Sequence, residues 1–156
     1  MVQSETTNAL EQNSRTHLMR ICSAATNAEL QVAVEPLVGT ETITVLRPPE
    51  TGLAMVRGRA GGTGAAFNLG EATVTRATVR LSSGEIGHSY LLGRVPARAH
   101  LSAIVDALGQ RRKARAALEA TLVAAVEKRL MKERATHRTE TDRTKVDFFT
   151  LVRGEN

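Results

Sequence analysis

The first part of the chain has the apolar spacing of two amphipathic helices. Two groups of apolar residues lie at spacings of three and four, which align side chains on one helix face. They are Leu18, Ile21, Cys22 and Ala25, followed by Leu30, Ala33, Val34 and Leu37. No such period precedes Ser14, which can cap the first helix. We therefore expect residues 1–13 to be disordered and residues 14–156 to form a single domain.

Local signals indicate where these helices begin and end. Thr26 and Glu29 have the spacing of a capping box, in which each side chain bonds the backbone N–H of the other residue. Pro36 and Gly39 are expected to end the second helix. Because Cys22 lies on the first apolar stripe, we interpret it as a buried structural thiol and not as a nucleophile.

The middle of the chain changes to short runs rich in β-branched residues. Four runs are separated by short connections: 42–46, 53–56, 73–81 and 86–92. Short strands with short connections are typical of an antiparallel meander. The Pro-rich segment 48–52 predicts a turn between the first two strands, because proline cannot donate to a sheet ladder. Residues 82–84, Ser-Ser-Gly, predict a hairpin turn before the fourth strand.

Helical spacing returns after the strands. Pro96 suits the first turn of a helix that Gly109 ends. A longer pattern runs from Arg111 to about Thr139, and at ~1.5 Å per residue that helix is roughly 40 Å long. The radius of gyration of a compact domain of this size is only about 15 Å. We therefore expect the helix to project from the body unless something packs along it.

The C-terminal segment 145–153 predicts a strand that is apolar on both faces. Phe148 and Phe149 are adjacent, and neighbouring side chains of a strand point to opposite faces. Either a partner protein covers one face, or helices of the same chain cover both. In the first case the partner interface includes Phe148, Phe149, Leu151 and Arg153.

Together these patterns predict an α+β fold. It consists of an antiparallel sheet of about four strands, flanked by N-terminal helices and a long C-terminal helix, and it ends in a short hydrophobic strand.

Composition restricts the class of function. With one cysteine the chain has no internal disulfide and no Cys-based zinc or iron–sulfur site of its own. Aromatic residues are only 3%, too few for a nucleic-acid platform of stacked rings. The sequence lacks a long apolar run and begins with a polar segment, so we expect a soluble cytoplasmic protein with no membrane contact.

The basic balance points to a polyanionic or acidic partner, although many basic proteins bind no nucleic acid. Net charge is +5, with 17 Arg and 4 Lys. Between Arg111 and Arg138 there are nine bases and three acids. This helix could therefore bind nucleic acid or contact an acidic surface of a partner protein.

Candidate chemistry is sparse. The Gly61–Gly64 segment resembles a phosphate-cradling loop in composition only, and a connection between strands fits it better. His17, His88, His100 and His137 lie far apart, without metal-ligand spacing. His88 shares a strand face with Ile86 and Tyr90, where a hydrogen-bonded imidazole fits better than a cleft residue.

Arginines provide one further candidate site. Arg76 and Arg80 share a strand face and, with Arg57 or Arg59 from a neighbouring strand, could cluster around phosphate oxygens. The alternative is an exposed, solubilising face, which we favour. No catalytic, cofactor-binding or metal-binding residue is assigned, and the profile suits an accessory subunit.

A collinear set of motifs adds a family resemblance. The stretches are RPPETG (47–52), RAGGTG (59–64), FNLGE (67–71), TRATVRL (75–81), GR (93–94) and DFFTLVRGE (147–155). This set resembles the PhnG subunit of the bacterial carbon–phosphorus lyase system, which degrades phosphonates. The resemblance covers roughly Ser14 to the C-terminus.

The resemblance implies an accessory role in a multi-subunit transferase. PhnG-like proteins form a core complex with PhnH-, PhnI- and PhnJ-type subunits and have a functional link to a PhnL-type subunit. The complex transfers the ribose triphosphate moiety of ATP to an alkylphosphonate and releases adenine, so ATP with Mg is its substrate. The ribosyl chemistry is credited to the PhnI-type subunit, and no cofactor is expected on this chain alone.

The rival interpretation is a free-standing basic protein that binds nucleic acid through its long helix. A helix that binds a partner protein should carry apolar residues along its stripe, as Leu118, Leu122 and Leu130 suggest. A third interpretation is direct catalysis, with Arg57, Arg76 or Arg80 reaching a triphosphate in a shared site.

Overall fold

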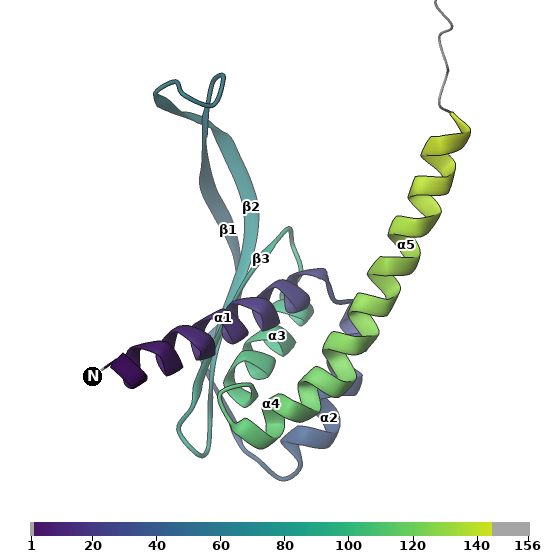
Figure 1. Ribbon diagram of the computed structural model, residues 1–156. Coiled ribbons are helices and arrows are strands. Elements are labelled where there is room, and N and C mark those ends of the chain that lie inside the picture. Colours follow the sequence, from purple (N-terminus) through teal and green to yellow (C-terminus); the bar gives the residue numbers. More distant parts are fainter. Residues whose placement is uncertain (1, 145–156) are drawn as a thin grey trace, which may run out of the picture.

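The computed structural model describes residues 2–144, and its side chains from Gln12 onward. Helices pack beside an antiparallel sheet, so the predicted α+β class is confirmed (Figure 1). The elements are α1 (Val2–Ala24), α2 (Asn27–Val38), β1 (Ile43–Arg59), β2 (Ala66–Leu81), β3 (Ile86–Leu92), α3 (Pro96–Leu108), α4 (Arg112–Leu118), the π-helical turn η1 (Glu119–Val123) and α5 (Ala124–Arg143).

The described residues form a sheet of three strands in the order β1-β2-β3, not about four. The two strands expected at 42–46 and 53–56 are one strand, β1, of 17 residues. The Pro-rich segment lies inside β1, where the pairing with β2 shifts between Val45 and Glu50. The predicted turn was wrong because β1 is an edge strand, in which a bulge accommodates prolines without breaking the ladder.

Two further predictions concern the ends of the chain. Helix α1 begins at Val2, earlier than the start predicted at Ser14. Its first part contains no proline or glycine, so the backbone can stay helical where the apolar period is missing. The expected terminal strand, with Phe148, Phe149, Leu151 and Arg153, lies outside the described residues.

One hydrophobic core joins the helices to the sheet. Helix α3 is its centre, with seven consecutive buried residues from Ser102 to Leu108. Leu18 and Cys22 of α1 are buried, as the apolar stripe predicted. Burial raises the pKa of the Cys22 thiol to about 12, so Cys22 is an inert packing residue at neutral pH.

Helix α3 approaches β3 closely at Gly87. A Cβ atom on Gly87 would lie 1.9 Å from the carbonyl oxygen of Ala103 and 2.5 Å from the backbone nitrogen of Ala107. Ala103 and Ala107 are both fully buried. The strand therefore needs glycine at this position, because any side chain would meet the backbone of the helix.

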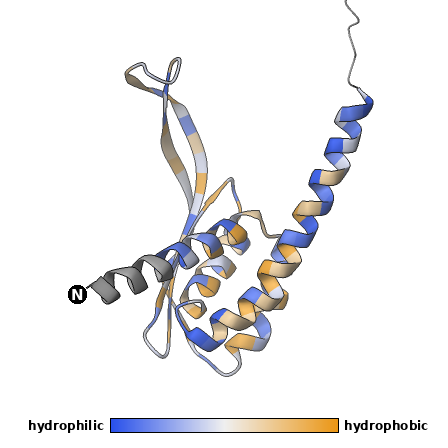
Figure 2. Ribbon diagram, in the orientation of Figure 1, coloured by the Kyte–Doolittle hydropathy of each residue, from blue (hydrophilic) through white to orange (hydrophobic). Residues whose placement is uncertain are grey.

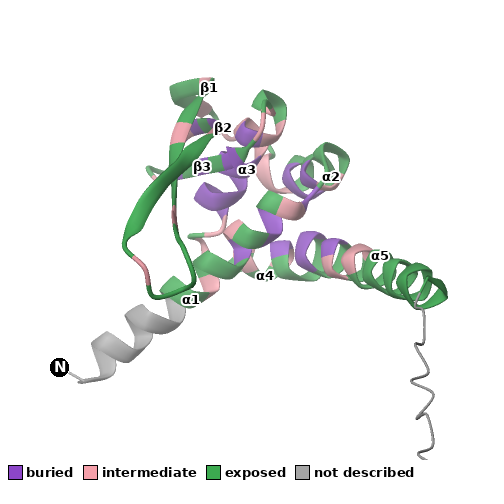
Figure 3. Ribbon diagram, turned by 90° about the horizontal axis from the view of Figure 1, so that it is seen from above, coloured by how far each residue is buried: buried purple, intermediate pink, exposed green. Residues whose placement is uncertain are grey.

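The long C-terminal helix is confirmed and contains a π-helical turn. Elements α4, η1 and α5, of 7, 5 and 20 residues, follow one another without a gap. Leu118, Leu122 and Val126 are buried in the core of this same chain. Beyond Leu130 the helix is exposed and projects from the body (Figure 3). The buried leucines therefore serve this fold and do not form a free stripe for a partner.

Charged side chains tie this helix to the rest of the fold. The predicted capping box is present, with Thr26 as N-cap and Glu29 at the third helical position. Arg129 of α5 donates to both carboxylate oxygens of Glu29, at 2.9 and 3.1 Å. At the start of α4, Arg111 donates to Glu41 at 2.8 Å and to Glu85 at 2.8 Å.

These ion pairs predict that stability falls in acid. Hydrogen bonds from Arg111 hold the pKa of Glu41 and of Glu85 at about 2, and those from Arg129 lower the pKa of Glu29 to about 2. A lowered pKa stabilises the folded state above the unfolded value, near 4.5, and this stabilisation is lost as the pH falls towards 2. We expect the free energy of unfolding to decrease between those two pH values.

The variant Arg129→Met tests this dependence. It should cost about 1 kcal/mol at neutral pH and flatten the loss of stability in acid, because Glu29 then titrates near its ordinary pKa. Urea denaturation at several pH values measures both effects. Arg134→Met on the exposed part of α5 is the control and should resemble the wild type. Equal pH profiles for wild type and Arg129→Met would contradict the prediction.

Candidate functional site

The sheet has one face against α3 and a second face that α3 does not cover. Gly87 and the buried Ala77 and Val79 mark the covered face. On the second face, here called the outer face, β2 and β3 place Arg76 opposite Tyr90, Thr78 opposite His88 and Arg80 opposite Ile86. Opposed residues of an antiparallel pair share a face. The predicted sharing of one strand face by Ile86, His88 and Tyr90 is therefore confirmed.

A small charged cluster lies on the outer face. Arg76 donates from Nε to Glu50 Oε1 at 2.7 Å, and Arg47 Nη1 lies 3.6 Å from the same oxygen. The Thr78 hydroxyl lies 3.3 Å from Nδ1 of His88. A shallow pocket of about 230 Å³ is bordered by Arg47, Arg76, Thr78 and His88, together with Met19 of α1.

The arginine cluster differs from the predicted one. Arg57 and Arg59 pair with Asn68 and Ala66, far along β2 from Arg76. Because β1 is one long strand, Asn68 lies eight residue steps along β2 from Arg76, roughly 26 Å at ~3.3 Å per residue. The arginine that joins Arg76 is Arg47, which the spacing of residues in the sequence did not indicate.

This cluster offers little catalytic chemistry. Glu50 is already paired with Arg76 and Arg47, and the His88 ring bonds only the hydroxyl of Thr78 among the described side chains. Nowhere between Gln12 and Thr144 do three or more His, Cys, Asp or Glu side chains gather in a way that could hold a metal ion. The outer face therefore fits recognition of a partner better than acid–base or metal chemistry.

Asp106 connects three elements beside this face. Its carboxylate is buried in α3 and accepts from Arg15 Nε and Nη2 at 2.8 and 2.7 Å. It also accepts the backbone N–H of His88 at 2.8 Å. Gln110 donates to the carbonyl oxygen of Ile86 at 2.7 Å. Side chains from the α3 region therefore satisfy backbone groups on the edge of β3 that no strand within residues 2–144 pairs.

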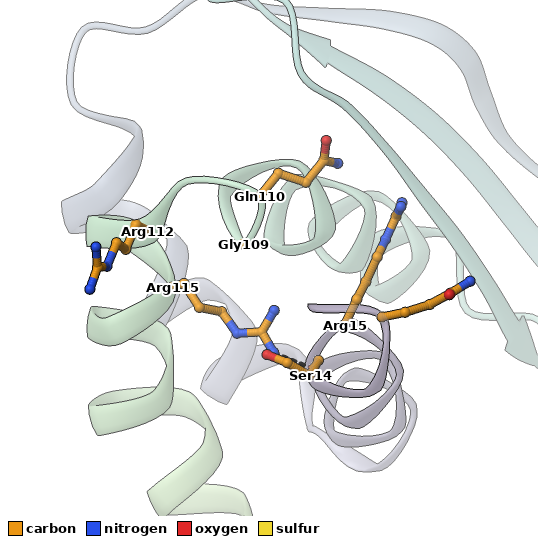
Figure 4. Close-up of a pocket in the computed structure, with 7 residues that line it drawn as sticks. Ser14, Arg15, Gly109, Gln110, Arg112 and Arg115 are labelled. Carbon is orange, nitrogen blue, oxygen red and sulfur yellow. Dashed lines mark hydrogen bonds between the residues drawn. The ribbon is translucent and has the colours of Figure 1, made fainter. Parts of the chain in front are cut away.

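A basic cleft of about 630 Å³ lies between α1 and the connection from α3 to α4 (Figure 4). Arg15, Arg112 and Arg115 line it, but their guanidinium groups do not converge. Arg15 is held by Asp106, whereas Arg115 bonds Glu119 and the carbonyl oxygen of Ser14. Arg112 points away from Arg15 in Figure 4. Arg15 and Arg115 therefore mainly hold the helices around the cleft together.

The β1–β2 hairpin extends beyond the helices as a two-stranded arm (Figure 1). The arm comprises residues 53–59 of β1, 66–73 of β2 and the turn between them, because β3 pairs with β2 only from Val74 onward. Gly61 and Gly62 of the turn have φ of 61° and 76°, values that favour glycine. The interpretation of this glycine-rich segment as a connection between strands is confirmed.

The arm exposes large apolar side chains. Figure 2 shows apolar positions interleaved with polar ones along it. The exposed apolar residues of the arm are Leu53, Met55, Val56, Phe67 and Leu69. A thin hairpin cannot bury them by itself, so the arm has the character of an interaction surface.

Comparison with known proteins gives the family. Residues 13–154 match the family model described as phosphonate metabolism protein PhnG. The chain belongs to the PhnG family. Over 138 residues, 88% of each chain, it is 53% identical to a Rhizobium meliloti (strain 1021) protein described as alpha-D-ribose 1-methylphosphonate 5-triphosphate synthase subunit PhnG. The motif resemblance found in the sequence is thereby confirmed for this PhnG-family chain.

Within residues 2–144, each helix is too short or too polar to cross a bilayer.

Proposed function

We propose that the chain is the PhnG subunit of an α-D-ribose 1-methylphosphonate 5-triphosphate synthase and acts as a structural subunit. The carrying observation is its 53% identity, over 88% of its length, to a subunit of that description. The described geometry supports a structural role, because Asp106, Arg111 and Arg129 are engaged in holding helices and strands together.

The reaction implied for such a synthase needs groups that partner subunits would supply. A phosphonate oxygen forms a bond to C1′ of the ATP ribose, the bond from C1′ to adenine breaks, and adenine leaves with a proton. The 5′-triphosphate, with its Mg²⁺, stays on the product. A strong acid for the leaving base and a site for the triphosphate are required. We place both on a PhnI-type subunit, in a cytoplasmic complex with PhnH- and PhnJ-type subunits and a functional link to a PhnL-type subunit.

Nucleic-acid binding by the long helix has weaker support. The exposed stretch from Lys132 to Arg143 carries four bases and three acids, so it is nearly neutral. Arg111 and Arg129, nearer the body, are already paired with glutamates. A phosphate-binding helix should instead present unpaired basic side chains along one face.

Reconstitution tests the proposed function. The synthase subunits of the source organism are mixed with ATP and methylphosphonate, with or without this chain, and released adenine is measured by chromatography. We expect release to fall to background without the chain and the chain alone to release none. Undiminished release without the chain, or turnover by the chain alone, would contradict the structural role.

A further inference from the structure

Apolar side chains follow one another along the outer face as a stripe, which is exposed at both ends and half-buried or buried at Ala54, Ala72 and Val74. In β1, Val56 pairs with Gly70 and lies two steps from Ala54, which pairs with Ala72. The same alternation leads down β2 to Val74, opposite Leu92, and to Arg76, opposite Tyr90. Since side chains on one face recur every second residue, Val56, Leu92 and Tyr90 all lie on the outer face.

The arm continues this stripe toward its tip. Phe67 pairs with Gly58, which lies two residues after Val56 and so shares its face. A Cβ atom on Gly58 would lie 2.5 Å from Cδ1 of Leu69, so Leu69 rests on this same side. The most exposed members of the stripe are Leu92 at 75%, Leu69 at 61% and Tyr90 at 57%.

Helix α3 occupies the opposite face of the sheet where β2 pairs with β3, whereas Leu53 and Met55, on that side of the arm, are exposed. Helix α3 packs on Ala77, Val79 and Gly87 of the covered face. On the outer face, α1 contributes Met19 to the pocket beside His88 and Tyr90. The stripe from Phe67 to Leu92 therefore remains open over much of its length within the described part of the chain.

The charges beside the stripe restrict the occupant. Arg47, Arg76 and Arg80 lie on or beside the outer face, and Glu50 supplies one carboxylate to the first two. A second copy of the chain would bring the same excess of arginine and a further net charge of +5. A favourable occupant must instead bring carboxylates around an apolar surface.

We propose that the outer face, including the arm, is the docking surface for another subunit of the synthase, whose apolar contact surface is bordered by carboxylates. The proposal rests on the proposed function. The stripe supplies the apolar centre of the interface, and Arg80 with the Arg47–Arg76 pair supplies its charged border.

Charged substitutions in the stripe test the proposal. The variants are Leu69→Asp and Leu92→Asp, made singly in the full chain and mixed with the remaining synthase subunits. Affinity is measured by titration calorimetry, and complex formation by size-exclusion chromatography. We expect each variant to weaken binding at least 100-fold, because the carboxylate would be buried against an apolar, acid-bordered surface.

Matched controls test whether a new charge at any exposed apolar position weakens binding, or only a charge in the stripe. Val32→Asp on α2 and Met131→Asp on α5 introduce the same charge at sites that are 70% and 67% exposed. We expect both to bind within about threefold of the wild type. All four variants change exposed side chains, and unchanged circular dichroism and thermal melting would confirm that each is folded.

The outcomes distinguish a failure of the proposed function from a failure of the proposed docking surface. A wild-type chain that binds no synthase subunit would refute the proposed function. A wild-type chain that binds, with Leu69→Asp and Leu92→Asp binding equally well, would refute this surface and leave the function intact. Loss of binding in the controls as large as in the stripe variants would also refute it.

The charged border has a test of its own. Arg80→Glu should weaken binding to the subunit about tenfold and reduce the salt dependence of binding.

Two other occupants would overturn the proposal. One is a second copy, seen as a dimer of the isolated chain that Leu92→Asp converts to a monomer. The other is nucleic acid, seen as co-eluting 260 nm absorbance that salt and Arg80→Glu remove.

Discussion

Replacing Gly87 with alanine should cost about 3 kcal/mol of stability and lower the melting temperature by roughly 10 °C. The added methyl would meet the Ala103 carbonyl oxygen and the Ala107 nitrogen at 1.9 and 2.5 Å. Both contacts are with helix backbone, which cannot rotate away as a side chain can. Helix α3 must therefore move away from β3, which reduces the packing density of the buried residues on both sides of the contact.

Gly52→Ala is the matched control for this experiment. Gly52 also lies in the sheet, but no atom comes within 4 Å of the position its Cβ would take. We expect its stability to stay within about 0.5 kcal/mol of the wild type. Thermal melting and urea denaturation of the two variants provide the comparison. If Gly87→Ala had the same melting temperature as Gly52→Ala, this result would contradict the close approach of α3 to β3.

Removing the Asp106 carboxylate should have a similarly large effect. In Asp106→Ala, the Arg15 guanidinium and the backbone N–H of His88 lose their shared acceptor. Breaking a buried ion pair costs ~3–5 kcal/mol. Because the Arg15 side chain is 46% exposed and can be rehydrated, we expect a loss near the lower limit, about 3 kcal/mol.

Hydrogen exchange separates the strand-edge role of Asp106 from its pairing with Arg15. Arg15→Ala keeps the bond to the His88 backbone but leaves the buried Asp106 carboxylate without its cation, so urea denaturation should show a large loss of stability for both variants. Hydrogen exchange at the His88 amide should become at least tenfold faster in Asp106→Ala and change much less in Arg15→Ala. Equal exchange rates at this amide in the two variants would show that Asp106 does not hold the edge of β3.

Helix ends and tight turns were predicted correctly where residues a few positions apart determine them. The capping box at Thr26 and Glu29 is present, as are Pro96 in the first turn of α3 and Gly109 at its end. The turn at 82–84 also joins β2 to β3, with the Gly84 N–H bonded to the carbonyl oxygen of Leu81. In each case, backbone sterics or a bond across a few residues determines the structure.

The candidate site was less predictable because it depends on strand register. Treating 48–52 as a turn split β1 in two, and this error placed Arg57 and Arg59 beside Arg76 in place of Arg47. Asp106 was overlooked although it interrupts the apolar run of α3. A single carboxylate inside such a run indicates a buried charge that needs partners. Its partners lie 91 and 18 residues away, and sequence spacing does not reveal them.

The sequence by itself determined the helices and their caps, the β character of the middle segment, the burial of Cys22 and the resemblance to the PhnG family. These follow from side-chain periodicity, local backbone preference and collinear motifs. Only the tertiary structure decided that β1 is continuous, that Leu118 and Leu122 belong to this chain's own core, and which sheet face α3 leaves open. These features depend on which distant segments pack together, and the hydrophobic effect that drives such packing is non-directional.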